Sequence, residues 1–132
     1  MIRNYLRLFS LILVAGLMAG CATTSTVRNL RGKGRTEIYD GAYDKVYDAA
    51  LEAVRDQAIE ILEKDKTTGA IIGKKGISYT SYGERIAVYV YKVEENKTRV
   101  EVISMKVLAT NIFAKDWTDT LFEAIRNNLK KT

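Results

Sequence analysis

Cys21 is the only cysteine of the chain, which has no histidine. A lone thiol can be modified covalently, but zinc, copper and haem centres usually need several His or Cys ligands. Nucleophilic systems of the Ser-His-Asp and Cys-His types also require an imidazole. The short segment Gly73–Gly76 lacks the length and the following Ser or Thr of a phosphate-binding loop. We therefore expect no catalytic residue, no metal and no cofactor, and we expect that the protein is not an enzyme.

The residues before Cys21 have the layout of a secretory signal. Arg3 and Arg7 are the only charges in this segment, and Leu11–Gly20 carries none. A basic start, an apolar middle and a small-residue exit predict a signal peptide over residues 1–20. A membrane-spanning helix is the alternative, but it needs about 20 consecutive apolar residues. A buried core cysteine is a further alternative, which the position between a leader and a polar segment disfavours.

The run Met18-Ala19-Gly20-Cys21 resembles the lipobox of bacterial lipoproteins, in which Leu is commoner at the position of Met18. The resemblance implies that the Cys21 sulfur receives a diacylglycerol and that the leader is cut before Cys21. It also implies acylation of the new amino group, since a single chain binds a membrane only reversibly. Ala22 follows where an Asp would favour the inner membrane. We therefore expect a lipid-anchored protein at the periplasmic leaflet of the outer membrane, with the lipid on Cys21 as its only attached group.

Residues 21–35 are predicted to be the lipidated cysteine and a flexible basic tether. The segment is small, polar and basic, with two glycines and no acid. A flexible chain of this length reaches roughly 20 Å. With the leader and tether set aside, 15 of the 21 basic residues remain beside all 16 acidic ones. This near-neutral remainder disfavours nucleic acid as a partner. The basic tether itself either meets an anionic membrane surface or is simply solvated.

Residues 36–132 are predicted to form one α+β domain. Apolar residues at helical spacing predict an amphipathic helix from about Ala42 to about Ile59. A second helix starts near Asp116, which can cap it. The segment 59–64 is either the last turn of the first helix or a strand. Strands are expected over Thr36–Gly41, Ala70–Lys75, Arg85–Val93 and Thr98–Leu108. The fold class is therefore an antiparallel sheet of four to five strands with two amphipathic helices packed on one face.

Alternation along two expected strands assigns their faces. Ile86, Val88 and Val90 match Val100 and Val102 as the buried face of the sheet. The intervening residues, Ala87, Tyr89 and Tyr91, then line the opposite face.

The runs "YDGAYDKVYDAALEAV" and "EKDKTTGAIIGK", followed by two alternating strands and a helix, resemble a family of small bacterial lipoproteins of unknown function. The element order is also broadly similar to the helix-grip domains of the BamC lipoprotein type. The resemblance covers about Thr36 to Leu129 and implies an accessory role in the cell envelope. The resemblance implies no active site, because the features that match are a pattern of hydrophobic residues and a turn, not catalytic residues.

Two sets of residues are candidate interaction surfaces. An acidic stripe on the first helix pairs like charges four residues apart, each pair costing roughly 0.2–0.5 kcal/mol, which a basic partner would relieve. Alternatively, it is an ordinary solvated helix face. A tyrosine group is either an exposed interface or is packed under a loop or the tether. The acidic candidate surface comprises Asp44, Asp48, Glu52 and Asp56, and the stripe continues to Glu60. The candidate tyrosines are Tyr79, Tyr82, Tyr89 and Tyr91.

The sequence therefore predicts a lipid-anchored periplasmic envelope protein that serves as a non-catalytic interaction or accessory module. Its expected partners are the membrane, through the lipid, and another envelope protein. The alternative is a binding module for a lipid, a peptidoglycan fragment or a small amphiphile held between the sheet and the helices.

Overall fold

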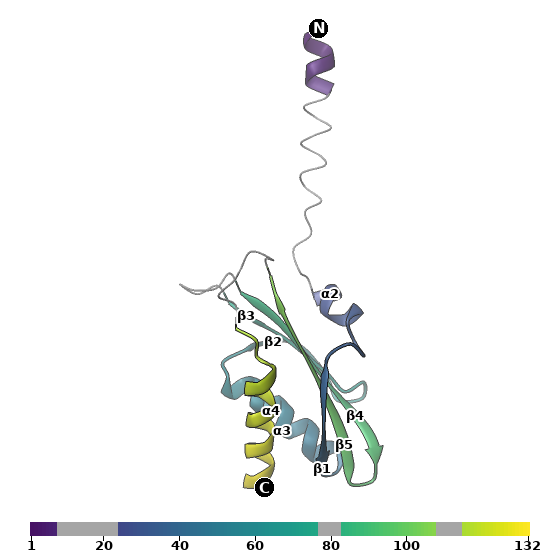
Figure 1. Cartoon of the computed structure of the whole chain (residues 1–132), viewed down its shortest axis with the longest axis vertical. Helices are drawn as coiled ribbons and strands as arrows, with labels where there is room; N and C mark the ends of the chain where they lie inside the picture. Colours follow the sequence, from purple (N-terminus) through teal and green to yellow (C-terminus); the bar gives the residue numbers. More distant parts are fainter. Residues whose placement is uncertain (8–23, 77–82, 108–114) are drawn as a thin grey trace.

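The computed structural model describes residues 1–7, 24–76, 83–107 and 115–132. Residues 2–7 are helical, and the later ranges form one antiparallel sheet with helices on both of its faces (Figure 1). The labelled elements are α2 (Thr24–Asn29), β1 (Arg35–Asp40), α3 (Tyr43–Asp56), β2 (Glu60–Asp65), β3 (Ala70–Lys75), β4 (Glu84–Glu94), β5 (Lys97–Lys106) and α4 (Thr118–Lys131). In the part of the chain described, no helix is long and apolar enough to cross a membrane.

The sheet has five strands in the order β1-β5-β4-β3-β2, and all neighbours are antiparallel. β4 and β5 form the central hairpin, in which Val88 lies opposite Val102 and Val90 opposite Val100. β1 and β2 are the two edge strands. The predicted α+β class, with a sheet of four to five strands and two helices on one face, is confirmed.

The segment 59–64, for which the sequence left two interpretations, is a strand. α3 ends at Asp56, and Ala58 has a positive φ of 51°. A left-handed residue cannot continue a right-handed helix, so the chain turns at Ala58. It then enters β2, which pairs with β3. This strand makes the sheet five-stranded.

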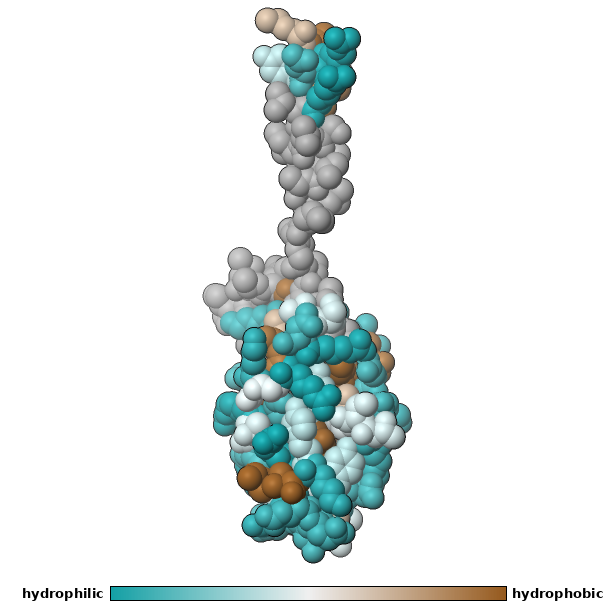
Figure 2. Space-filling view, turned by 90° about the vertical axis from the view of Figure 1, so that its right-hand side faces the viewer, coloured by the Kyte–Doolittle hydropathy of each residue, from teal (hydrophilic) through white to brown (hydrophobic). Residues whose placement is uncertain are grey.

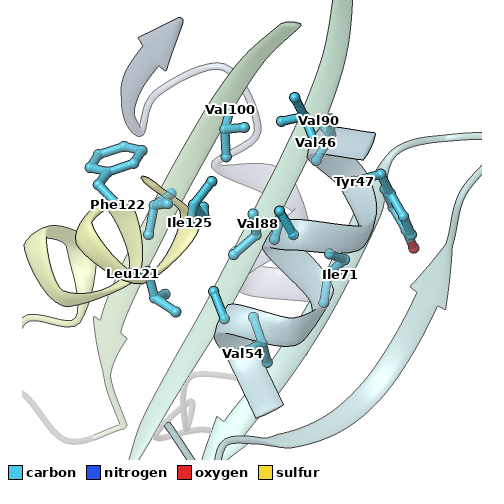
Figure 3. Packing of buried hydrophobic residues seen from close by; sticks show 14 of the residues in the cluster. Val46, Tyr47, Val54, Ile71, Val88, Val90, Val100, Leu121, Phe122 and Ile125 are labelled. Atoms are coloured by element: carbon cyan, nitrogen blue, oxygen red, sulfur yellow. The ribbon is translucent and has the colours of Figure 1, made fainter. Parts of the chain in front are cut away.

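The main core lies between the sheet and the helices α3 and α4 (Figure 3). The residues predicted to face inward on β4 and β5 are all buried here, and the apolar stripes of both helices are buried or packed against this core. Val54, Ile71 and Phe122 are each at most 1% exposed. Side chains therefore fill the space between sheet and helices, which argues against a ligand held there.

The start of α4 differs slightly from the expected capping by Asp116. The helix begins at Thr118, and Trp117 holds the cap position without a side-chain hydrogen bond. The backbone N–H of Thr118 still donates to Asp116 Oδ1 at 2.9 Å. Hydrogen bonds from the side chain and the backbone of Thr118 lower the pKa of the Asp116 carboxyl. Asp116 thus stabilises the helix start from one position further out.

Candidate functional site

The second face of the sheet is covered by α2 and the loop after it. Val27 of α2 is fully buried, and Leu30 packs beside it. They form a second apolar cluster with Ala70, Ile72, Ala87, Tyr89, Ile103, Tyr91 and Met105. We call residues 24–34 the strap. The expectation of a flexible tether is wrong for these residues, because Val27 and Leu30 gain a hydrophobic contact that a solvated chain would lack.

Glu101 of β5 fastens the loop of the strap. Its side chain is only 1% exposed. One carboxylate oxygen accepts the N–H groups of Gly32 at 2.8 Å and Gly34 at 2.7 Å. The other accepts the Tyr91 hydroxyl at 2.7 Å and the Gly32 N–H at 3.0 Å. A buried carboxylate needs such donors, so Glu101 and the strap stabilise each other.

Arg31 is the second fastening of the strap. Its guanidinium carbon lies 4.6 Å from the ring centroid of Tyr89 and 5.1 Å from that of Tyr91. The same side chain donates to the Tyr91 hydroxyl at 3.2 Å and to the Thr68 carbonyl at 2.9 Å. Arg28, one turn earlier, forms an ion pair with Glu63 of β2. Basic residues of the strap therefore bind the domain itself.

These contacts decide between the two interpretations of the tyrosines. Tyr89 is 2% exposed and Tyr91 is half-buried, because the strap lies over both. Burial and the hydrogen bond to Glu101 raise the pKa of Tyr91. Tyr89 and Tyr91 therefore form no open interface, and the interpretation in which they pack under the tether is confirmed. Tyr79 and Tyr82 lie outside the described residues.

The molecular face that carries α2 is mostly hydrophilic, with hydrophobic residues in small separate spots (Figure 2). Ile38 and Val93 are exposed hydrophobic side chains of β1 and β4, at 63% and 47%. Scattered residues of this kind are normal on a protein surface. The strap thus covers the apolar sheet face, and the surface exposed to solvent on this side is mostly polar.

Asp44, Asp48, Glu52 and Asp56 are exposed on α3, as predicted, but they are partly compensated from within the chain. The expectation that Glu60 continues this stripe is wrong, because Glu60 lies on β2 and forms an ion pair with Lys74. Lys66, in the turn after β2, lies 3.3 Å from a carboxylate oxygen of Asp44 and 3.0 Å from one of Asp48. The hydrogen bond to Asp48 raises the pKa of the Lys66 ammonium. Arg55 lies 3.6 Å from Glu52. The repulsion expected along the stripe is therefore weaker than the spacing alone suggests.

A groove of about 430 Å³ runs between α3 and α4, beside the C-terminal half of the stripe. Asn128 crosses it, since its amide donates to the Ala49 carbonyl and to Asp56, both at 3.3 Å. The groove is lined by Lys45, Asp48, Ala49, Glu52, Asp56, Asn128, Lys131 and Thr132. The structure thus brings Asp48, Glu52 and Asp56 together at one hollow.

Asp44 belongs to a different hollow, of about 500 Å³, which it shares with Tyr91. This cleft lies where the strap meets the turn between β2 and β3. Its lining residues are Arg31, Tyr43, Asp44, Thr67, Thr68, Val90, Tyr91 and Lys92. The acidic stripe and the tyrosine group therefore meet at this cleft. Arg31 already donates hydrogen bonds there to the Tyr91 hydroxyl and the Thr68 carbonyl.

Cys21, the predicted lipidation site, lies outside the described residues. Within the described ranges, no group of three or more His, Cys, Asp or Glu side chains could hold a metal ion. The expectations of no metal, no cofactor and no enzymatic activity stay predictions from the sequence.

Comparison with known proteins gives a family and a fold. Residues 5–107 match the family described as "Protein of unknown function (DUF3568)". No curated protein matches the sequence. A chain in the crystal structure of the adenylate sensor from AMP-activated protein kinase, in complex with the ribofuranotide ZMP, is 13% identical with a TM-score of 0.50. That match covers 73% of this chain and 95% of the other.

The crystal structure of Ara h 8.0201 is 11% identical with a TM-score of 0.46, over 74% of this chain and 96% of that one. At such low identity the likeness to the adenylate sensor concerns the fold alone. It agrees with a helix-grip kind of arrangement, in which a sheet packs against helices.

Proposed function

The chain belongs to the DUF3568 family of proteins of unknown function, and we propose that it is a lipid-anchored envelope protein that binds another protein. The anchor is the acylated Cys21, supported by the residues Met18–Cys21 and by the leader before them. Ala22 supports the outer membrane as the location. The family assignment and the fold are compatible with a binding or accessory module.

The groove between α3 and α4 is the proposed contact surface. The observation that carries this assignment is the closure of the tyrosine-bearing sheet face by the strap, at Tyr89 and Glu101. Glu52 and Asp56 are exposed at the groove, and the Ala49 side of α3 gives it an apolar floor. The lining also contains Lys45 and Lys131, but the three carboxylates of Asp48, Glu52 and Asp56 outnumber these two ammonium groups. This acidic balance fits an amphipathic segment of a partner that carries Lys or Arg.

Site-specific cross-linking in native membranes tests the assignment. A photo-activatable residue at position 52 or 56 should yield one dominant envelope protein, linked through a peptide rich in Lys or Arg. Position 123 is the matched control, since Glu123 is an exposed acid on α4 that does not line the groove. An equal yield from positions 52 and 123 would rule out the groove as the contact surface.

Charge reversal gives an independent test of the same surface. Glu52→Lys combined with Asp56→Lys should reduce partner capture at least about tenfold, because opposed charges at an interface become like charges. Glu123→Lys should leave capture unchanged. If both changes lower capture equally, the effect is one of net charge, and the groove is not the contact.

A further inference from the structure

The strap starts only three residues after the proposed lipid anchor, which limits how the domain can sit on a membrane. Three residues of extended chain, from Cys21 to Thr24, span about 11 Å at most. From α2 onward the chain is fixed to the sheet by buried Val27 and by the Arg28–Glu63 ion pair. A lipid on Cys21 therefore holds one particular end of the domain near the bilayer.

The register of the sheet identifies that end. Arg28 meets Glu63, which lies opposite Ile72 in β3. Arg31, three residues later, lies over Tyr89 and Tyr91, further toward the β4–β5 turn. α2 therefore runs toward this turn, and its start points the other way, toward the end of the sheet where β3 ends (Figure 1). Thr24 precedes Arg28 by about one helical turn, or about 6 Å.

Lysines gather at this end of the sheet. Lys75 of β3 lies opposite Glu84 of β4, which in turn lies opposite Lys106 of β5. The backbone N–H of Lys115 donates to Glu84 at 3.3 Å, so Lys115 belongs to the same group. We call the end that carries Lys75, Lys106 and Lys115 the lysine end.

The lysine end has cations available for a partner. Lys75 is occupied, because its ammonium donates to the carbonyls of Gln57 and Ala58. Lys106 and Lys115 are exposed, and the Lys115 ammonium also lies 4.4 Å from the ring centroid of Trp117. Among the described residues, neither forms an ion pair with an acidic side chain. The opposite end, at the β4–β5 turn, exposes the acids Glu94 and Glu95 beside Lys92 and Lys97, and Lys92 forms an ion pair with Glu95.

We propose that the lysine end lies on an anionic phospholipid surface, with Lys106 and Lys115 at the headgroups. The proposal rests on the lipid anchor of the proposed function. The short connection holds this end of the domain near the bilayer, where its ammonium groups attract anionic headgroups. The strap thus sets the orientation of the domain as well as its distance from the membrane. The end of α4 at Lys131, which lines the α3–α4 groove, then points away from the bilayer (Figure 1).

Fluorescence quenching on the full-length, lipidated protein tests the orientation. Because lipid occupies Cys21, an introduced cysteine is the only free thiol for a fluorophore. Gly76→Cys places it at the lysine end, where a Cβ meets no atom within 4 Å. Asn96→Cys places it in the exposed β4–β5 turn. The protein is reconstituted into vesicles of phosphatidylcholine with about one third phosphatidylglycerol and nitroxide-labelled headgroups.

We expect at least about threefold stronger quenching at position 76 than at position 96. Lys106→Glu combined with Lys115→Glu should reduce the quenching at position 76 about twofold or more. The matched control, Lys97→Glu with Lys130→Glu, reverses two exposed lysines away from the lysine end and should leave it unchanged. Equal quenching at both positions, or quenching that survives the reversal at Lys106 and Lys115, would overturn the proposal.

The mass of the N-terminal peptide separates this inference from the proposed function. An acylated Cys21 together with equal quenching would leave the lipid anchor standing and overturn the orientation alone. An unmodified Cys21 would overturn both.

Discussion

Glu101 and Gly34 are 67 positions apart in the sequence, yet a hydrogen bond of 2.7 Å joins the carboxylate of one to the backbone N–H of the other. Gly34 can approach so closely because it has no side chain. A Cβ at this position would lie 2.6 Å from the carbonyl oxygen of Val102. The contact fixes the loop that leads from the strap into β1. It makes residues 24–34 part of the folded domain.

We expect Glu101→Gln to loosen the strap. The amide is neutral and replaces one acceptor oxygen by an NH2 donor. At least one of the three donors to Glu101, which are the N–H groups of Gly32 and Gly34 and the Tyr91 hydroxyl, therefore loses its acceptor. The free energy of unfolding should fall by about 1–3 kcal/mol. Urea denaturation measures this loss, and hydrogen exchange should rise over residues 24–34. Glu94→Gln, on an exposed carboxylate of β4, is the control.

An unchanged exchange rate over the strap in Glu101→Gln would show that the buried carboxylate does not hold it. Faster exchange across the whole sheet would instead indicate a general loss of stability.

Tyr89→Ala should be strongly destabilising. The ring is 2% exposed, and removal of a buried aromatic side chain typically costs about 3–5 kcal/mol. Arg31→Ala leaves the ring in place but removes the cation that lies over it, together with the hydrogen bonds to the Tyr91 hydroxyl and the Thr68 carbonyl. This exposed side chain should contribute less, about 0.5–2 kcal/mol. Thermal unfolding of the two variants measures the difference. A Tyr89→Ala protein as stable as the parent would contradict the buried position of this side chain.

Gly69→Ala should also destabilise the fold, at the turn between β2 and β3. Gly69 has a positive φ of 76°, and a Cβ there would lie 2.1 Å from the Val90 carbonyl oxygen. The left-handed conformation alone costs a non-glycine residue about 1–2 kcal/mol, and the clash adds to it. Gly76→Ala is the control, since no atom lies within 4 Å of its Cβ. Equal denaturation midpoints for the two variants would contradict this geometry.

Stability should fall at alkaline pH through the buried tyrosines. Burial, together with Glu37, raises the pKa of Tyr39 above its ordinary value of 10.0. A raised pKa favours the neutral form in the folded state, so its contribution is full below pH 10.0 and is lost as the pH rises through the folded pKa. Urea unfolding between about pH 8 and about pH 11 should show this loss.

Tyr39→Phe isolates the contribution of this hydroxyl. The variant loses the hydrogen bonds to Glu37 at 3.0 Å and to the Phe122 carbonyl at 3.3 Å. It should therefore be less stable than the parent near neutral pH and should lose less stability as the pH rises. A parallel alkaline loss in both proteins would assign the effect to other groups.

The sheet and the two long helices could be predicted from the sequence because their signals are local. Alternation in β4 and β5 assigned Val88 and Val100 to the core, and helical spacing did the same for Val54 and Ile125. The strap could not be predicted in this way. Its glycines resemble those of a flexible linker, whereas in the structure Gly32 and Gly34 supply backbone donors to Glu101.

Two signals could have indicated the strap. Val27 and Leu30 are apolar residues at helical spacing in an otherwise polar segment. Glu101 stands in a strand between Val100 and Val102, on the face that also carries Tyr89. An acid opposite a tyrosine on an apolar face requires a donor from elsewhere in the chain. The compensation of Asp44 and Asp48 by Lys66 likewise depends on the turn after β2, which helix periodicity does not describe.

Both the proposed envelope location and the proposed orientation of the domain depend on the lipid anchor at Cys21. Mass spectrometry of the N-terminal peptide, from full-length protein isolated from its own membranes, tests it most directly. We expect a peptide that begins at Cys21 and carries a diacylglycerol on the sulfur and an acyl chain on the amino group. A peptide that begins at Met1, or an unmodified Cys21, would contradict the account.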